Sequence, residues 1–148
     1  MNSLKWVPIA FLLIVQSASA AEPTDPREAF AATPVEKAYI LEQMRLFVTS
    51  IQTITQGLAS GDMQAVADAA AARGGRQNTN DPHFPASLGP KLPAPWKQFG
   101  GGTRRGFDEL ADAAKSGAPK EKSLAILAAT MANCVACHQT YKIVEADH

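Results

Sequence analysis

Four stretches of this chain place apolar residues every three or four positions, which is the spacing of one face of an α-helix. The first stretch opens with a capping box, Thr33 and Glu36, and carries Pro34 at the first helical position. Ser60 and Gly61 end it, because glycine readily takes the left-handed conformation that closes a helix. The pattern predicts a long first helix, and its apolar face is Ile40, Met44, Phe47, Ile51, Ile54 and Leu58.

The second predicted helix begins after Asp62, a favourable capping residue, and stops at Gly74. The third begins near Pro95 and is interrupted by Gly100–Gly102, where each glycine costs about 1 kcal/mol relative to alanine inside a helix. This triplet is compatible with a kink, with a late helix start near Thr103, or with the close approach of a bulky group to the backbone.

The fourth predicted helix opens at Pro119 and ends near the motif described below. Residues 74–95 join the second and third helices as an irregular stretch with five prolines, long enough to cross between non-adjacent helix ends. No stretch shows the alternation of a strand. We therefore expect an all-α fold, an antiparallel up-and-down four-helix bundle. The expected apolar face of the last helix is Leu124, Leu127, Met131, Cys134, His138 and Tyr141.

The first twenty residues have the features of a secretory signal peptide. Lys5 supplies a positive charge, an apolar run extends from Trp6 to Val15, and Ala18–Ala20 is an A-x-A cleavage site. A membrane anchor is the alternative, but a spanning helix needs about 20 apolar residues and this run is shorter. We predict cleavage after Ala20, no membrane span in the mature protein, and a periplasmic location. Residues 21–32 would be a flexible lead-in and residues 33–148 a single domain.

The charge balance excludes some functions. The chain has 14 basic and 14 acidic side chains, and removal of the signal leaves one acidic group in excess. Nothing in this balance favours nucleic acid or an anionic membrane. Asp108, Glu109 and Asp112 are predicted to form a solvated helix face, with no paired-carboxylate site around them. We do not expect an enzyme.

The chemistry of this chain is concentrated in Cys134-Val135-Ala136-Cys137-His138, a C-x-x-C-H signature. This pattern is typical of covalent c-type haem attachment, in which both thiols bond to the haem and the imidazole binds the iron. A disulfide, a thioredoxin-like pair and a structural zinc site are the alternatives. A thioredoxin-like pair would lie near a βαβ pattern, and zinc would need four ligands. The sequence therefore predicts one covalent haem c, attached to Cys134 and Cys137, with His138 as the proximal iron ligand.

The segment from Cys134 to Lys142 resembles the C-terminal haem segment of the class II c-type cytochromes, the cytochrome c-prime family. Three shorter segments are similar to its low-spin branch: Met44 with Arg45, Lys91–Pro93, and Phe107–Leu110. The resemblance implies a left-handed up-and-down four-helix bundle with haem near one end. It also implies that a basic residue after the motif, here Lys142, pairs with a haem propionate. A solvated lysine at a helix end is the alternative for Lys142.

The second axial position of the iron decides the function. In the low-spin relatives a methionine of the first helix is the distal ligand, and Met44 occupies the matching place. Met63 and Met131 are less suited, since Met63 opens the second helix and Met131 shares a helix with His138. Met44 could instead be ordinary core packing, because methionine fills irregular apolar space well. Arg104 and Arg105 could bind a propionate or face water.

Two main functions follow. The first is a periplasmic mono-haem cytochrome that carries single electrons between periplasmic redox proteins, with His/Met ligation that raises the reduction potential. The alternative is a five-coordinate protein that binds nitric oxide or carbon monoxide. An accessory haem subunit of a larger oxidoreductase is a weaker third possibility. A homodimer is also compatible with this sequence.

Overall fold

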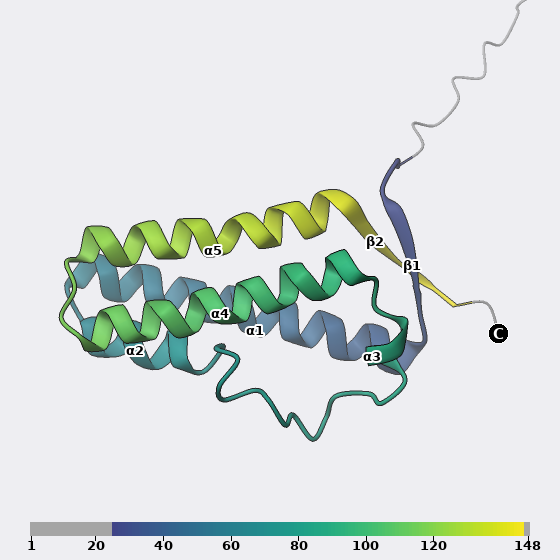
Figure 1. Ribbon diagram of the computed structural model, residues 1–148, viewed down its shortest axis with the longest axis horizontal. Coiled ribbons are helices and arrows are strands. Elements are labelled where there is room, and N and C mark those ends of the chain that lie inside the picture. Colours follow the sequence, from purple (N-terminus) through teal and green to yellow (C-terminus); the bar gives the residue numbers. More distant parts are fainter. Residues whose placement is uncertain (1–24, 147–148) are drawn as a thin grey trace, which may run out of the picture.

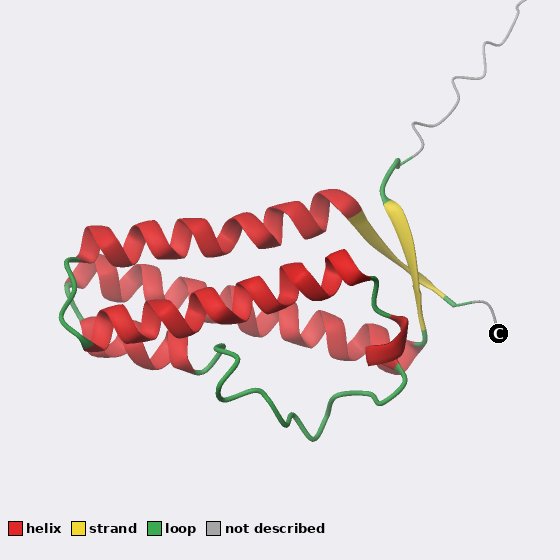
Figure 2. Cartoon of the chain, in the orientation of Figure 1, coloured by secondary structure: helices red, strands yellow, loops and turns green. Residues whose placement is uncertain are grey.

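The computed structural model describes residues 25–146, which form five helices and a two-stranded sheet (Figures 1 and 2). Three long helices, α1, α4 and α5, run side by side along the molecule, and the sheet crosses one end of them. The predicted signal peptide lies outside the described residues. In chain order the elements are β1 (Glu28–Ala32), α1 (Pro34–Ser60), α2 (Met63–Ala71), α3 (Leu88–Lys91), α4 (Ala94–Lys115), α5 (Lys120–Thr140) and β2 (Tyr141–Glu145).

The prediction of a clean four-helix bundle is wrong. All four predicted helices form, but a fifth short helix, α3, lies in the proline-rich connection, and β1 pairs with β2 in a parallel sheet. Phe30 lies opposite Ile143 in this ladder. The strands join the two ends of the described chain, so β1 falls within the predicted lead-in. Tyr141 begins β2 and does not continue the last helix.

The start of α1 is fixed by the capping box that the sequence predicted. The Thr33 amide donates to Glu36 at 2.9 Å, and the Glu36 amide donates to the Thr33 hydroxyl at 3.3 Å. The same buried carboxylate accepts from Lys91 Nζ and from Ser87 Oγ, each at 2.7 Å. Lys91 first, then the Thr33 amide and Ser87, lower the pKa of Glu36 to about 2. Glu36 therefore fastens the segment around α3 to α1.

The buried residues form two apolar clusters. The larger lies between α1, α2, α4 and α5, and in it Phe107 stacks on Phe47 with ring centroids 5.5 Å apart. The smaller lies at the sheet end, where Phe30 packs against Trp96 at 4.9 Å. This second cluster is built from Phe30, Ala32, Ile40 and Leu88, with Tyr39, Met44, Leu92, Trp96 and Ile143 packed against it. It positions the elements of the candidate site.

Asp108 has a structural role that the sequence did not predict. Its side chain is largely buried and accepts from the backbone amide of Gly75 at 2.9 Å. The Arg76 guanidinium pairs with Asp108 at 3.1 Å and with Asp112 at 2.9 Å. These contacts hold the chain that leaves α2 against α4. The prediction of a solvated face is wrong for Asp108.

Helix α4 runs unbroken through Gly100–Gly102, so the late helix start near Thr103 is wrong. Two glycines face α5. A Cβ on Gly102 would lie 2.8 Å from the side-chain oxygen of Asn133, and a Cβ on Gly106 would lie 2.9 Å from Thr130 Cγ2. Glycine at these positions lets the two helix backbones approach closely.

Alanine at position 106 is expected to destabilise the protein. Thr130 is buried and its hydroxyl donates to Ile126 O at 2.7 Å, so it cannot move away cheaply. Overpacking costs up to about 3 kcal/mol, against a gain of about 1 kcal/mol in helix propensity. At Gly100 no described atom lies within 4 Å of a new Cβ, so Gly100→Ala should stabilise by about 1 kcal/mol. Denaturant unfolding of both variants measures this, and equal effects would contradict it.

Candidate functional site

The two cysteines of the motif lie on the inward side of α5. Both thiols are free and half-buried. Cys134 and Cys137 lie two turns beyond Leu127 and Thr130, which are both buried. Burial raises the pKa of the Cys137 thiol, and the neighbouring Cys134 adds to this rise. The two sulfur atoms therefore point toward the interior from one face of the helix.

The buried face of α5 differs from the predicted one. Leu124 is 56% exposed and Met131 is 39% exposed, whereas Ser123, Leu127 and Thr130 are buried. The buried face of α5 lies nearer to Cys137 than the predicted face does, and His138 is exposed at the edge of this buried face. In the described part of the chain, no hydrogen bond or ion pair engages the His138 ring. Its nitrogens are available to a ligand.

The segment before β1 closes the end of α5 beside the motif. Arg27 Nη1 donates to His138 O at 3.2 Å and to Tyr141 O at 3.4 Å. These carbonyls lie at the negative end of the helix dipole, where a cation is favourable. Lys142, the predicted propionate partner, instead donates to Asp25 O at 2.9 Å. Arg27 therefore fixes the backbone of the predicted iron ligand, and Lys142 fixes the segment that carries Arg27.

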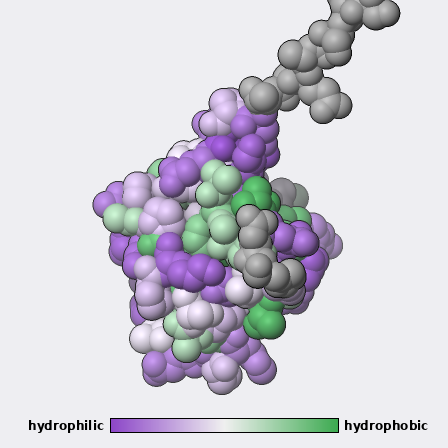
Figure 3. Space-filling view, turned by 90° about the vertical axis from the view of Figure 1, so that its right-hand side faces the viewer, coloured by the Kyte–Doolittle hydropathy of each residue, from purple (hydrophilic) through white to green (hydrophobic). Residues whose placement is uncertain are grey.

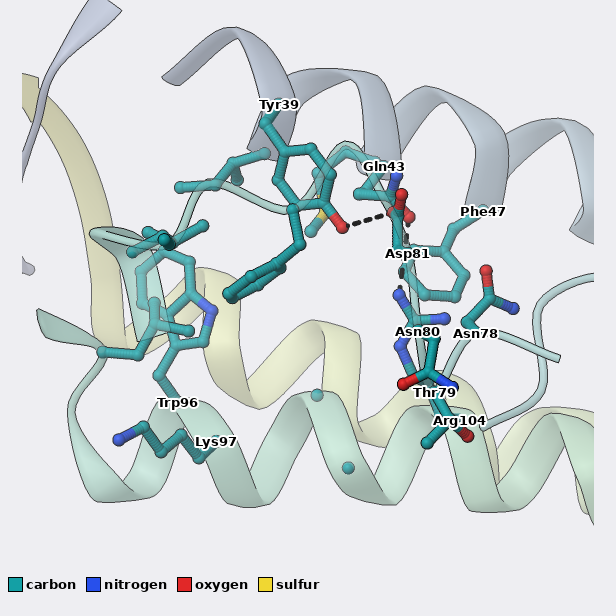
Figure 4. Close-up of a pocket in the computed structure, with 18 residues that line it drawn as sticks. Tyr39, Gln43, Phe47, Asn78, Thr79, Asn80, Asp81, Trp96, Lys97 and Arg104 are labelled. Carbon is teal, nitrogen blue, oxygen red and sulfur yellow. Dashed lines mark hydrogen bonds between the residues drawn. The ribbon is translucent and has the colours of Figure 1, made fainter. Parts of the chain in front are cut away.

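Met44 is half-buried on α1 and lines a cavity of about 700 Å³ between α1, α4 and the proline-rich connection (Figure 4). Apolar side chains form one part of the wall, among them Phe47, Leu88 and Trp96. Trp96 also packs on Tyr141, at the end of α5, with ring centroids 5.1 Å apart. Cys134, Cys137 and His138 do not line this cavity. The cavity thus lies next to the motif-bearing end of α5 without including the motif.

The helices that carry Met44 and His138, α1 and α5, lie next to each other. At the far end, Thr55, Leu58 and Ala59 of α1 share a groove with Lys120, Glu121 and Leu124 of α5. At the sheet end, Lys37 pairs with Glu145 at 2.8 Å, so the two helices run antiparallel (Figure 1).

Residues that are separated by whole turns lie on the same face of a helix, so the faces in contact at the groove can be followed along α1 and α5. Met44 lies about three turns before Thr55 on the same face of α1, and His138 lies about five turns after Lys120 on the same face of α5. Thr55 of α1 and Leu124 of α5 both line the groove. The same number of residues, counted back from Thr55 and forward from Leu124, leads to Met44 and to Val135, so these two residues have about the same height along the helices. That height is roughly 5 Å along the axis from His138.

The polar side of the cavity was missed at the sequence level. Tyr39 donates its hydroxyl to Asp81 at 2.8 Å, and Figure 4 shows this pair on the cavity wall. Burial first, and then Asp81, raise the pKa of Tyr39 to about 12. Arg104 reaches from α4 across the cavity toward Gln43 of α1. No local pattern marks Asp81, because the fold alone brings the long connection to α1.

Comparison with known proteins adds no identification. No family model, no curated protein and no solved structure matches this chain. Within residues 25–146, no group of three or more His, Cys, Asp or Glu side chains could hold a metal ion. No helix in this range has the length and apolar character needed to cross a membrane.

The donor set fits haem c. Two free thiols one helical turn apart are followed directly by a histidine whose ring is exposed. The neighbouring cavity falls within the range of about 300–1,000 Å³ found for ligand pockets. The sheet end of the molecule presents hydrophilic side chains with smaller hydrophobic areas between them (Figure 3).

Proposed function

We propose that this chain is a mono-haem c-type cytochrome of the class II family that carries single electrons between periplasmic redox proteins. Cys134 and Cys137 hold the haem, His138 is the proximal iron ligand and Met44 the distal ligand. The arrangement of α5 carries the proposal: two half-buried thiols on its inward side, with an exposed histidine directly after them. A homodimer and the export signal stay predictions.

Each residue has a defined task in this proposal. Each cysteine adds its S–H across one haem vinyl group, which leaves a thioether bond and no leaving group. The haem then supplies the reversible change between ferric and ferrous iron. Arg27 holds the His138 carbonyl, so the imidazole starts from a fixed backbone. Methionine at the distal position raises the reduction potential.

One observation favours the five-coordinate alternative. Met44 packs against the apolar cluster that contains Ile40 and Leu88, as ordinary core methionine does. If Met44 stays in that packing, the distal iron position is open, and the protein would bind nitric oxide or carbon monoxide. The two functions share the thioether anchors and differ only in the position of this side chain.

Absorption spectra of the haem-loaded protein test the proposal. We expect a low-spin ferric spectrum with a far-red methionine-to-iron band, and a ferrous form that does not shift promptly when carbon monoxide is added. A high-spin spectrum with immediate carbon monoxide binding would support gas binding instead. A preparation without covalent haem would overturn both functions.

A further inference from the structure

Arg104 is a half-buried cation to which the described part of the chain, residues 25–146, gives no ion pair. Among the described residues, its nitrogens donate to Arg73 O and to Gln43 Oε1 alone, both at 3.4 Å. These distances are long for hydrogen bonds, whose usual range ends at about 3.2 Å. The guanidinium lies over the Phe47 ring, 5.6 Å from its centroid, at the wall of the cavity.

The nearby carboxylates are already engaged elsewhere. Asp81 accepts from the Tyr39 hydroxyl and from the His83 amide, each at 2.8 Å. Asp108 accepts from the backbone amide of Gly75 and pairs with Arg76. Burial is the main cause that lowers the pKa of Arg104, and Arg73 adds to it, while Tyr39, Asp81 and Asp108 act in the opposite direction without reversing the fall. Even a half-buried cation with long hydrogen bonds is better stabilised when an anion completes its shell.

The position of Arg104 indicates what that anion is attached to. Gly102 and Gly106 face α5, and Arg104 lies between them in sequence but on the opposite side of α4, toward the cavity. In haem, the two carboxylates lie on the edge opposite the vinyl groups. A haem attached through Cys134 and Cys137 on α5 therefore presents its carboxylates away from α5.

We propose that Arg104 binds a haem carboxylate in this cavity, an inference that rests on the proposed function. Lys142 is less suited to this task, because its ammonium group donates to the Asp25 carbonyl beside β1. Arg104 offers a planar guanidinium, which suits bidentate binding of a carboxylate. Bound in this way, the carboxylate supplies the charge-assisted hydrogen bonds that the described residues do not give to Arg104.

The test compares Arg104→Gln with Arg105→Gln in the haem-loaded protein. Both variants lose one positive charge from neighbouring positions of α4, but Arg105 is exposed. The readout is the reduction potential measured across pH. Loss of a cation beside the haem carboxylate should raise the pKa of that carboxylate by about 1–3 units. The pH at which the curve of reduction potential against pH inflects should therefore rise by the same amount. Arg105→Gln should leave the inflection unchanged.

The charged groups around Arg104 are the same in both variants. They are Tyr39 of α1, Arg73 after α2, Asp81 of the connection, and Asp108 and Lys97 of α4.

Arg104→Lys keeps a cation and should restore most of the wild-type inflection. Circular dichroism confirms that each variant is folded. If Arg104→Gln fails to fold, Arg104→Met, which also removes the cation, takes its place, and an inflection that does not move contradicts a binding role.

The outcomes separate this inference from the function on which it rests. A haem-loaded, folded Arg104→Gln protein with an unmoved inflection overturns the role of Arg104 alone. A preparation with no covalent haem overturns the proposed function and this inference together. Free benzoate is a further probe: if it raises the melting temperature of the wild-type protein but not of Arg104→Gln, the carboxylate comes from a free ligand and the haem assignment is wrong.

Discussion

Replacement of both Cys134 and Cys137 by alanine should remove all covalently bound haem from the protein. The chain contains two cysteines, so no other thiol could form a thioether in their place. Both thiols are free and point inward from α5, one turn apart, which is the arrangement that haem attachment requires. Haem staining of a denaturing gel measures the loss, because only covalent haem survives denaturation.

Single substitutions sharpen this prediction. Cys134→Ala or Cys137→Ala should each leave one thioether, and the pyridine haemochrome band should move to longer wavelength because one vinyl group stays unsaturated. Val135→Ala is the matched control: Val135 lies between the cysteines, is 53% exposed, and should leave haem content unchanged. Covalent haem in the double variant would rule out attachment at this motif.

Local signals predicted the helices well, and non-local pairing explains the error in fold class. The Thr33–Glu36 capping box and the Gly61 end of α1 depend on residues within a few positions, and both form as expected. The parallel ladder joins Glu28–Ala32 to Tyr141–Glu145, more than a hundred residues apart. The two five-residue strands, EAFAA and YKIVE, do not alternate regularly between apolar and polar residues, so only the folded chain reveals them.

The site was predicted in part, for the same reason. The C-x-x-C-H motif is a local pattern, and the sequence places it on a helix, as observed. The face of α5 was misjudged because its many alanines carry little information about burial, and the small side chains of Ser123 and Thr130 proved to face inward. Arg104 and Arg105 are equivalent in sequence. Only the fold places Arg104 at the cavity and leaves Arg105 exposed.

Met44→Ala should convert a six-coordinate haem into a five-coordinate one. By the helical repeat, Met44 shares a face of α1 with Thr55, which lines the groove between α1 and α5, and its height along the bundle is close to that of His138. Loss of its sulfur should abolish the far-red band, give a high-spin ferric spectrum, lower the reduction potential and let the ferrous form bind carbon monoxide promptly. Absorption spectroscopy and redox titration measure these changes together.

Two other methionines serve as controls for this variant. Met131 is 39% exposed on α5, and Met63 packs against the larger apolar cluster. Met131→Ala tests the loss of a methionine from the helix that carries His138, and Met63→Ala tests the loss of a partly buried one from the core. Both should keep the far-red band, although Met63→Ala should unfold at lower temperature because it leaves a space in the core. If Met44→Ala kept the band while Met63→Ala lost it, the distal ligand would come from α2. If wild-type protein and all three variants lacked the band and bound carbon monoxide alike, Met44 would be core packing and the distal face open.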